Sequence, residues 1–372
     1  MKVFNKYLNA CITVFLIGLF FVWCSPVLGQ GARPNIQAVK IGAIIPLTGP
    51  ISFVGELIKE GLELAIEEVN PKIMNDGYQL EIVYGDNQGS TAKSVSLIQK
   101  DIHINKIKFF MVSPTPSSMA VAPIVDKAKR IMFAGSTHPY ITDLSQYIFR
   151  TCASNAEENE LLIKYAEKKG IKSVGALFVD DDFGQSAINY FHNHFKGKVV
   201  VKEAYNMKHT DFRNQILKLK QSAPDAILIE GYGIAFPIIL KQMVELGIKC
   251  PILGNLGFVN PPVQKTLKFL PEDFKNNIIF SSPTFSKYFT ELIENKFSRK
   301  PNLNQAFAYD FIMLIASEIS KYGLDVEKIK EAVPMIKNYT GAFENITFLP
   351  NGDSRSIVKL MKISNGEIIP YE

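Results

Sequence analysis

Residues 108–137 read KFFMVSPTPSSMAVAPIVDKAKRIMFAGST and contain a strand, a helix and a second strand in succession. The two apolar runs, Phe109–Val112 and Ile131–Ala134, predict strands that are covered on both faces. Apolar residues recur between them at helical spacing, and a helical connection of this kind joins parallel strands. Each strand ends in small polar residues, at 113–118 and 135–137. Because parallel strands end at the same edge of a sheet, we expect these two turns to lie side by side.

The two turns have the chemistry of an anion site. They offer hydroxyl groups and backbone N–H groups at or near the start of a helix, where negative charge is stabilised. The alternative is that the hydroxyls only cap helices, as serine and threonine often do. The adjacency of the turns favours binding, and we expect them to hold the acidic end of a small ligand. The first turn contains Ser113, Thr115, Ser117 and Ser118, and the second contains Gly135, Ser136 and Thr137.

The same strand, polar turn and helix unit recurs along most of the chain. Continuous apolar runs at 39–46 and 173–179 each end in a turn, and a helix follows each turn. The first of these helices is expected to stop at Pro71. The last forty residues differ, because the alternating segments 341–348 and 356–363 predict two strands joined by a hairpin turn. A chain of 372 residues with this pattern is long enough for two α/β domains.

The N-terminus carries a targeting signal. An apolar run extends from residue 8 to residue 23, and the small residues Val27 and Gly29 follow at positions typical of signal peptidase cleavage. We expect residues 1–29 to be removed and the mature chain to be exported to the periplasm. A retained membrane anchor is the alternative, since the run is only slightly shorter than the roughly 20 residues that span a bilayer. Lipid attachment at Cys24 is disfavoured, because bulky side chains precede it.

Composition excludes some functional classes. A hydrophobic content of 47% and a charged content of 21% are those of a soluble globular protein. The formal net charge of +5 includes Lys2 and Lys6 of the leader, so the rest of the chain carries +3. That excess is too small to indicate binding to nucleic acid or to a membrane surface.

The sequence predicts neither a metal site nor a bound cofactor. Two cysteines remain after cleavage, Cys152 and Cys250, and they are interpreted as buried thiols, although an exported protein can also pair them. The five histidines show no metal-ligand spacing. Three aspartates at 180–182 predict a solvated turn at a helix start, because consecutive side chains on a turn point in different directions.

The order and spacing of several segments make the chain similar to the type I periplasmic solute-binding proteins of ABC transporters, in particular the leucine/isoleucine/valine-binding group. These segments are VKIGAIIPLTGP (39–50), GLELAIEEVN (61–70), APIVDKAKRIMFAGST (122–137), YIFRT (147–151), VDDDFGQS (179–186), PDAILIEGYG (224–233), AYDF (308–311) and YTGAFENITFLPNGD (339–353).

The resemblance implies an α/β fold with two lobes, each a mainly parallel sheet flanked by helices, that close on a ligand between them. A hinge of three crossing strands would lie near residues 152, 281 and 344. Lobe 1 would then comprise residues 38–153 plus 282–343, and lobe 2 residues 154–281 plus 344–372.

The resemblance also implies roles for residues on both walls of the cleft. A ligand carboxylate would meet a hydroxyl of the first turn, Thr115 together with Ser117 or Ser118, with the choice between Ser113 and Thr115 left open. It would also meet Gly135, Ser136 and Thr137 of the second turn. Phe183 and Tyr232 occupy the positions of aromatic residues that close over the ligand from the second lobe. Phe53 would contact the apolar end of the ligand.

One position departs from the family pattern. Amino-acid-binding members usually place an acid near residue 256 to bind the ligand ammonium group, and this chain has Leu256 there. An unpaired buried ammonium group costs several kcal/mol or more. Either Glu230 supplies the charge or the ligand has no α-ammonium group, and both alternatives stay open. Glu230 can equally be a solvated residue at a strand end.

The function expected from these observations is that of an exported, non-enzymatic and monomeric solute-binding subunit. It would deliver an amino acid, such as a branched-chain one, or an aromatic or aliphatic carboxylate to the membrane permease of an ABC importer. The alternative is a ligand-sensing subunit that reports to a receptor through the same lobe closure. An exported hydrolase is disfavoured, because the sequence contains no GxSxG motif and no metal motif.

Overall fold

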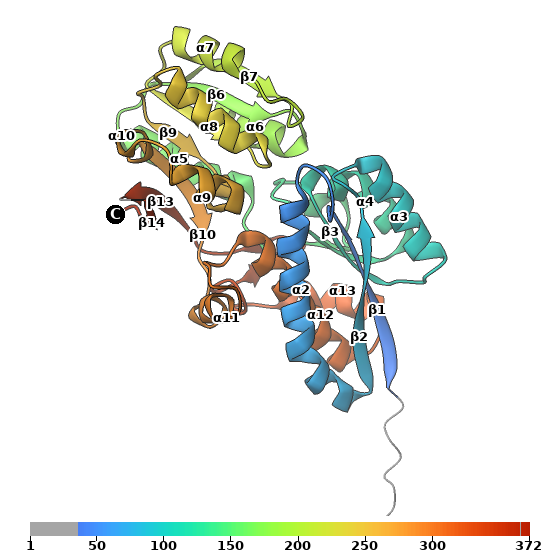
Figure 1. Ribbon diagram of the computed structural model, residues 1–372. Helices are drawn as coiled ribbons and strands as arrows, with labels where there is room; N and C mark the ends of the chain where they lie inside the picture. The colour runs from blue at the N-terminus through green and yellow to red at the C-terminus, as the bar shows by residue number, and fades with distance from the viewer. Residues whose placement is uncertain (1–35, 365) are drawn as a thin grey trace, which may run out of the picture. The chain divides into compact units, whose positions relative to one another are not determined.

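The computed structural model describes residues 36–364 and 366–372, and residues 38–372 form one compact unit. The predicted leader and Cys24 therefore lie outside the described residues. Two large sheets, each flanked by helices, carry the fold (Figure 1). The predicted α/β class is confirmed.

The first sheet has five strands in the order β2-β1-β3-β4-β5, and β1, β3, β4 and β5 pair in parallel. Strands β3 and β4 are buried at every position, as their continuous apolar sequence predicts. Its strands are β1 (Gln37–Ile45), β2 (Tyr78–Asp86), β3 (Phe109–Val112), β4 (Ile131–Ala134) and β5 (Ile148–Phe149). The helices that connect them are α2 (Ser52–Ile73), α3 (Thr91–His103) and α4 (Thr115–Ala128), with short 3-10 helices at Met74–Asp76 and Thr142–Leu144.

The second sheet has seven strands in the order β14-β13-β10-β9-β8-β6-β7. Strands β6 to β10 pair in parallel, and β13 and β14 are added antiparallel at one edge. Its strands are β6 (Ser173–Val179), β7 (Lys198–Tyr205), β8 (Ala226–Glu230), β9 (Ile252–Gly254), β10 (Ile278–Pro283), β13 (Val358–Ser364) and β14 (Glu367–Pro370). Its helices are α5 (Asn155–Lys168), α6 (Asp182–His194), α7 (Arg213–Gln221), α8 (Ala235–Glu245), α9 (Pro261–Leu267) and α10 (Glu272–Lys275), with a 3-10 helix at Leu256–Val259.

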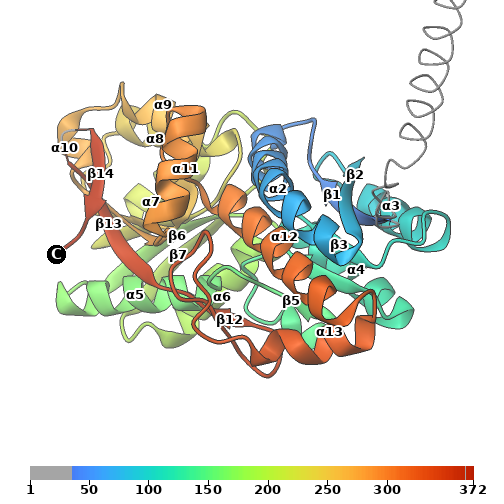
Figure 2. The ribbon, with the colours of Figure 1, turned by 90° about the horizontal axis from the view of Figure 1, so that it is seen from below.

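The chain then returns to the first sheet. It forms α11 (Lys287–Phe297), α12 (Leu303–Tyr322), α13 (Val326–Ala332) and a 3-10 helix at Val333–Met335. Helix α12 lies beside α2 in both views (Figures 1 and 2). The contact is close, because a Cβ atom on Gly61 would lie 2.2 Å from the backbone oxygen of Gln305. Apolar residues of α12 and of strands β1, β3 and β4 therefore share one core.

Two local predictions are wrong. Helix α2 continues through Pro71 to Ile73 instead of stopping there. Proline removes one backbone donor, but the loss falls in the last turn, and the buried Ile73 anchors that turn in the core. The second error concerns the C-terminal strands. The predicted hairpin is reduced to β11 (Thr347–Phe348) and β12 (Ser354–Arg355), and the longer strand β13 pairs with β10 and β14 instead.

A buried ion pair explains where the hairpin lies. The Arg150 side chain has 0% exposure, and its Nε and Nη2 atoms donate to Asp353 Oδ1 at 2.9 and 2.6 Å. Phe348 also packs against Phe133 of β4, with ring centroids 6.5 Å apart. The β11–β12 hairpin is thus held against the first sheet, although the predicted division assigns it to lobe 2. The lobe boundaries themselves remain a prediction.

Cys152 and Cys250, the two cysteines within the described residues, are both free thiols. Cys152 is buried, as predicted, whereas Cys250 is half-buried. In the described part of the chain, no helix combines the length and the apolar character needed to cross a membrane.

Candidate ligand-binding site

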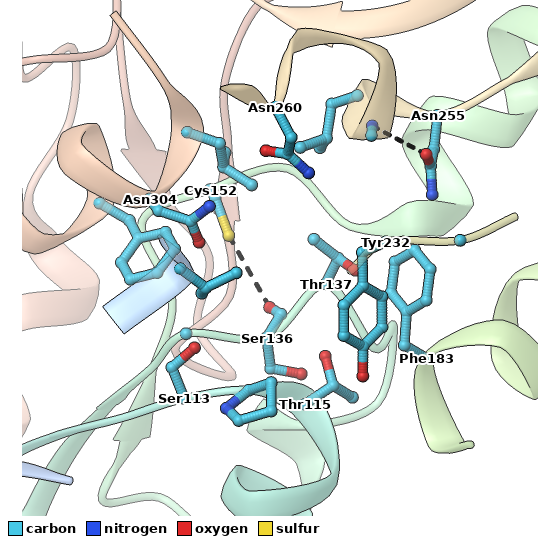
Figure 3. A pocket seen from close by; sticks show the side chains of 18 residues that line it. Ser113, Thr115, Ser136, Thr137, Cys152, Phe183, Tyr232, Asn255, Asn260 and Asn304 are labelled. Carbon is cyan, nitrogen blue, oxygen red and sulfur yellow. Dashed lines mark hydrogen bonds between the residues drawn. The ribbon is translucent and has the colours of Figure 1, made fainter. Parts of the chain in front are cut away.

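A cavity lies at the carboxyl ends of strands from both sheets (Figure 3). Its empty volume is about 610 Å³, a figure that includes open solvent. Its lining residues are Val54, Ser113, Pro114, Thr115, Gly135, Ser136, Thr137, Cys152, Phe183, Gly231, Tyr232, Asn255, Leu256, Gly257, Asn260, Leu303, Asn304 and Phe307.

The two polar turns of the first sheet are in direct contact, as predicted. Strands β3 and β4 are parallel neighbours, and the Gly135 N–H group donates to the Val112 carbonyl oxygen at 2.8 Å. A Cβ atom on Gly135 would lie 2.7 Å from Ser113 Cβ and 3.0 Å from Phe307 Cζ. Residue 135 must therefore be glycine for the turns to approach this closely.

Hydroxyl groups of these turns form one side of the cavity. Ser113, Thr115 and Ser136 lie together there (Figure 3), so the structure brings both candidates of the first turn to the site. Thr137 also lines the cavity, and the residue is only 7% exposed. Its Oγ1 atom has no hydrogen-bond partner among the described residues. A buried hydroxyl without a partner is unfavourable, so this atom is poised to bond a ligand.

Ser117 does not line the cavity. Its Oγ atom lies 2.9 Å from Ser94 Oγ and 3.4 Å from Asn87 Nδ2, so it joins α4 to α3 and to the end of β2. The neighbouring Ser118 hydroxyl donates to the Val112 carbonyl oxygen at 2.7 Å. Both serines face into the protein because they lie on the inner side of the first turn of α4.

Two aromatic residues of the second sheet form a wall of the cavity. Phe183 lies on α6 and Tyr232 follows β8, and their rings meet edge to face with centroids 5.4 Å apart. The Tyr232 hydroxyl donates to the Asp181 carboxylate. Burial raises the pKa of Tyr232 well above its usual value, so the phenol stays protonated. The same Asp181 caps α6 by accepting from the Gly184 N–H group at 3.0 Å, which agrees with a turn role for the aspartate triplet.

Phe53 and Glu230 also lie away from the cavity lining. Phe53 is partly buried in the first turn of α2 and packs against the core. Glu230 is 1% exposed and lies behind Asn255, whose Nδ2 atom donates to Glu230 Oε2 at 3.0 Å. Burial raises the pKa of Glu230 to about 7, because no cation compensates for the lost hydration. The predicted alternative of a solvated strand-end residue is wrong, while Leu256 does line the cavity.

Three asparagine side chains that line the cavity opposite the hydroxyl groups were not predicted from the sequence. All three line the cavity, and Figure 3 shows them spread in an arc from Asn304 through Asn260 to Asn255, on the side away from Thr115. Asparagine at the ends of strands and helices is common as a cap, so the sequence held no signal that distinguished these three. The 18 lining residues include no aspartate, glutamate, lysine or arginine. The cavity thus has hydroxyls at one end, amides at the other, and apolar or aromatic side chains between.

Acidic, histidine and cysteine side chains do not cluster as a metal site anywhere in residues 36–364 and 366–372. The hydroxyl and amide groups that line the cavity are suited to bind a small molecule with more than one polar group.

Comparison with known proteins gives a consistent picture. Residues 38–366 match the pattern of the family described as periplasmic binding protein. A Leu/Ile/Val-binding protein homologue of Brucella abortus is 28% identical over 274 residues, covering 70% of this chain and 74% of the relative.

Solved structures are also similar. A leucine-binding protein of Thermotoga maritima has a TM-score of 0.81 at 26% identity, covering 90% of this chain and 98% of the other. A solute-binding protein of an ABC transporter from R. palustris, in complex with 4-hydroxybenzoate, has a TM-score of 0.79 at 25% identity, covering 90% and 96%.

Proposed function

This chain belongs to the periplasmic binding protein family, as its sequence resemblance predicted, and we propose that it is the exported solute-binding subunit of an ABC importer. In this proposal it binds a small carboxylate-bearing ligand in the cavity between the two sheets and presents it to a membrane permease. Closure of two lobes around the ligand would produce a conformation that the permease can distinguish from that of the empty protein.

The observation that carries the proposal is the unpartnered Thr137 hydroxyl. It faces a cavity that Ser113, Thr115 and Ser136 also line, at the carboxyl ends of β3 and β4. The first turn of α4 begins at Thr115, and the N–H groups of Thr115 and Ser117 have no acceptor within the helix. Hydroxyl donors and a helix N-terminus together favour a carboxylate, which needs several hydrogen bonds once it is removed from water.

The cavity favours a carboxylate without an α-ammonium group. None of its lining side chains is acidic, and Asn255 separates the Glu230 carboxyl group from the cavity. An ammonium group held there would lose its hydration without gaining a charged partner. Aromatic and aliphatic carboxylates therefore fit the lining better than leucine or valine does. The alternative, an amino acid whose ammonium group reaches Glu230, requires Asn255 to move aside.

Calorimetric titration of the mature protein tests the proposal. The panel contains leucine, isoleucine, valine, benzoate, 4-hydroxybenzoate and hexanoate, with the amide benzamide as the control that lacks a carboxylate. We expect at least one carboxylate to bind, benzamide not to bind, and Thr137→Val to weaken binding. Absence of binding by every carboxylate would refute the ligand class. If leucine or valine binds tightly, the exclusion of an ammonium group is wrong, and loss of that binding in Glu230→Gln would show that Glu230 supplies the charge.

A further inference from the structure

We propose that the ligand carries, at the end opposite its carboxylate, an uncharged group that both donates and accepts a hydrogen bond, such as a hydroxyl or a primary amide. This inference rests on the proposed function and narrows the class of ligand. It is carried by Asn260, Asn302 and Asn304, which are joined by hydrogen bonds at the amide end of the cavity.

A backbone group sets the direction of this chain of amides. Asn302 caps α12, and its Oδ1 atom accepts from the Asn304 backbone N–H group at 2.9 Å. A backbone N–H group can only donate, so the oxygen of the Asn302 amide must point toward the helix. The Asn302 Nδ2 atom is then left to donate to Asn260 Oδ1, at 3.1 Å.

The orientation of the other two amides follows. Asn260 uses its oxygen to accept from Asn302, so its NH2 group is the part that remains. Asn304 uses its Nδ2 atom to donate to Asn302 Oδ1 at 2.9 Å, so its oxygen remains. Neither remaining group has a hydrogen-bond partner within the described chain.

The two residues that carry the remaining groups are largely buried. Asn260 is 3% exposed and Asn304 is 9% exposed, and both line the cavity. One donor and one acceptor thus face the ligand, and leaving either without a partner in the closed site is unfavourable. A methyl group satisfies neither of them. A second carboxylate would oppose the Asn304 oxygen, and an ammonium group would oppose the Asn260 NH2 group.

Helix capping alone does not explain the set. Asn302 is a cap, but Asn304 lies inside the first turn of α12, and Asn260 precedes α9 without making a side-chain capping bond. The Asn302–Asn260 bond also joins segments 42 residues apart in sequence, at the ends of two different helices. Helix capping does not require asparagine side chains from two helices to meet. Recognition of a neutral polar group by one donor and one acceptor does require it.

Two sets of carboxylates with the same body and different ends test the inference by calorimetry on the mature protein. The aromatic set is 4-methylbenzoate, 4-hydroxybenzoate and 4-carbamoylbenzoate, and the aliphatic set is hexanoate, 5-hydroxypentanoate and 4-carbamoylbutanoate. We expect the hydroxyl or carbamoyl member of at least one set to bind about tenfold tighter, or more, than its methyl-ended counterpart. Equal or tighter binding of the methyl-ended members would overturn the inference and leave the proposed function intact.

Variants separate the two ends of the ligand. Asn304→Leu should reduce the preference for the polar end to about one, while Thr115→Val, at the hydroxyl end, should weaken every member of a set by a similar factor. If Asn304→Leu also weakens all members equally, the residue acts on the fold and the inference fails. If no carboxylate of either set binds and leucine does, the inference is wrong but the carboxylate site stands; if leucine also fails to bind, both proposals fall.

Asn302→Asp gives a test that a structural role would not mimic. The new carboxylate still accepts from the Asn304 backbone, so the helix cap survives, but it no longer donates to Asn260. The Asn260 amide must then turn its NH2 group toward position 302 and its oxygen toward the cavity. We expect 4-aminobenzoate, mainly a donor at its far end, to gain relative to 4-carbamoylbenzoate in this variant. An unchanged ratio would contradict the proposed direction of the amide chain.

Discussion

Replacing Thr137 with valine removes a hydroxyl that no described residue engages, while the shape of the side chain is kept. Two effects of opposite sign are expected. A buried hydroxyl without a hydrogen bond costs about 1–3 kcal/mol in proteins, so the unliganded variant should be as stable as the wild type or more stable by about 1 kcal/mol. A hydrogen bond to a charged group contributes about 1.5–3 kcal/mol, so the dissociation constant for a carboxylate should rise about 10- to 150-fold.

The chain offers a matched control in Thr142. Its Oγ1 atom is also buried without a partner, but the residue lies in the 3-10 helix at Thr142–Leu144 and does not line the cavity. Thr142→Val should therefore change stability in the same direction and leave ligand affinity unchanged. Urea unfolding without ligand gives the stabilities, and calorimetry with the tightest carboxylate gives the affinities.

Two results would refute this reasoning. Unchanged affinity in Thr137→Val means that the hydroxyl does not meet the ligand. A loss of stability in Thr137→Val, with none in Thr142→Val, means that the Thr137 hydroxyl has a partner within the unliganded protein, and its role would then be structural.

Three further perturbations follow from the structure. Asp353→Asn should lower the free energy of unfolding in urea by about 3–5 kcal/mol, because the Arg150 guanidinium would stay buried without its counter-charge; a loss below about 1 kcal/mol would contradict the importance of the pair. Glu230 has a folded-state pKa of about 7, above its unfolded value, so its contribution to stability is greatest below about pH 4.5 and is lost as pH rises to about 7. Glu230→Gln lacks this titration, so its free energy of unfolding should rise by about 3 kcal/mol relative to that of the wild type between about pH 4.5 and pH 7. Urea unfolding at both pH values measures the change, and an equal difference between the two proteins at both would contradict the reasoning. Gly135→Ala should weaken binding at least about tenfold and cost about 1–3 kcal/mol of stability, since its Cβ would force Ser113 away; wild-type affinity by calorimetry would show that the turns tolerate separation.

The parts of the fold that follow from local pattern were predictable. Strands β3 and β4 have the residues expected, because a run of four apolar residues between polar turns has few alternatives. Their parallel pairing then determined which turns would meet. The end of α2 was not predictable, since Pro71 is tolerated only because tertiary contacts hold the last turn. Strand β13 likewise selected its partners β10 and β14 through contacts made far along the chain.

The candidate site was predictable in position but not in detail. A sequence shows which turns carry hydroxyls, but it does not show which way each hydroxyl points, and this is why Ser117 was grouped with Thr115. The amide end could not be found at all. Asn260 and Asn302 meet only after two lengths of chain have folded against each other, and either residue alone reads as an ordinary cap.

The return of the chain to the first sheet bears on the order in which the protein matures on the ribosome. All five strands of that sheet have been synthesised by residue 149, yet the core that they share with α2 stays incomplete until α12 is made at residues 303–322. The Arg150 guanidinium lacks its ion-pair partner for longer still, because Asp353 is synthesised later than α12. A nascent chain of 300 residues therefore exposes apolar surface and holds an unpaired cation. The part of the protein around the first sheet is thus synthesised first but completed last. Premature termination within the last fifth of the message would affect the part of the protein encoded earliest.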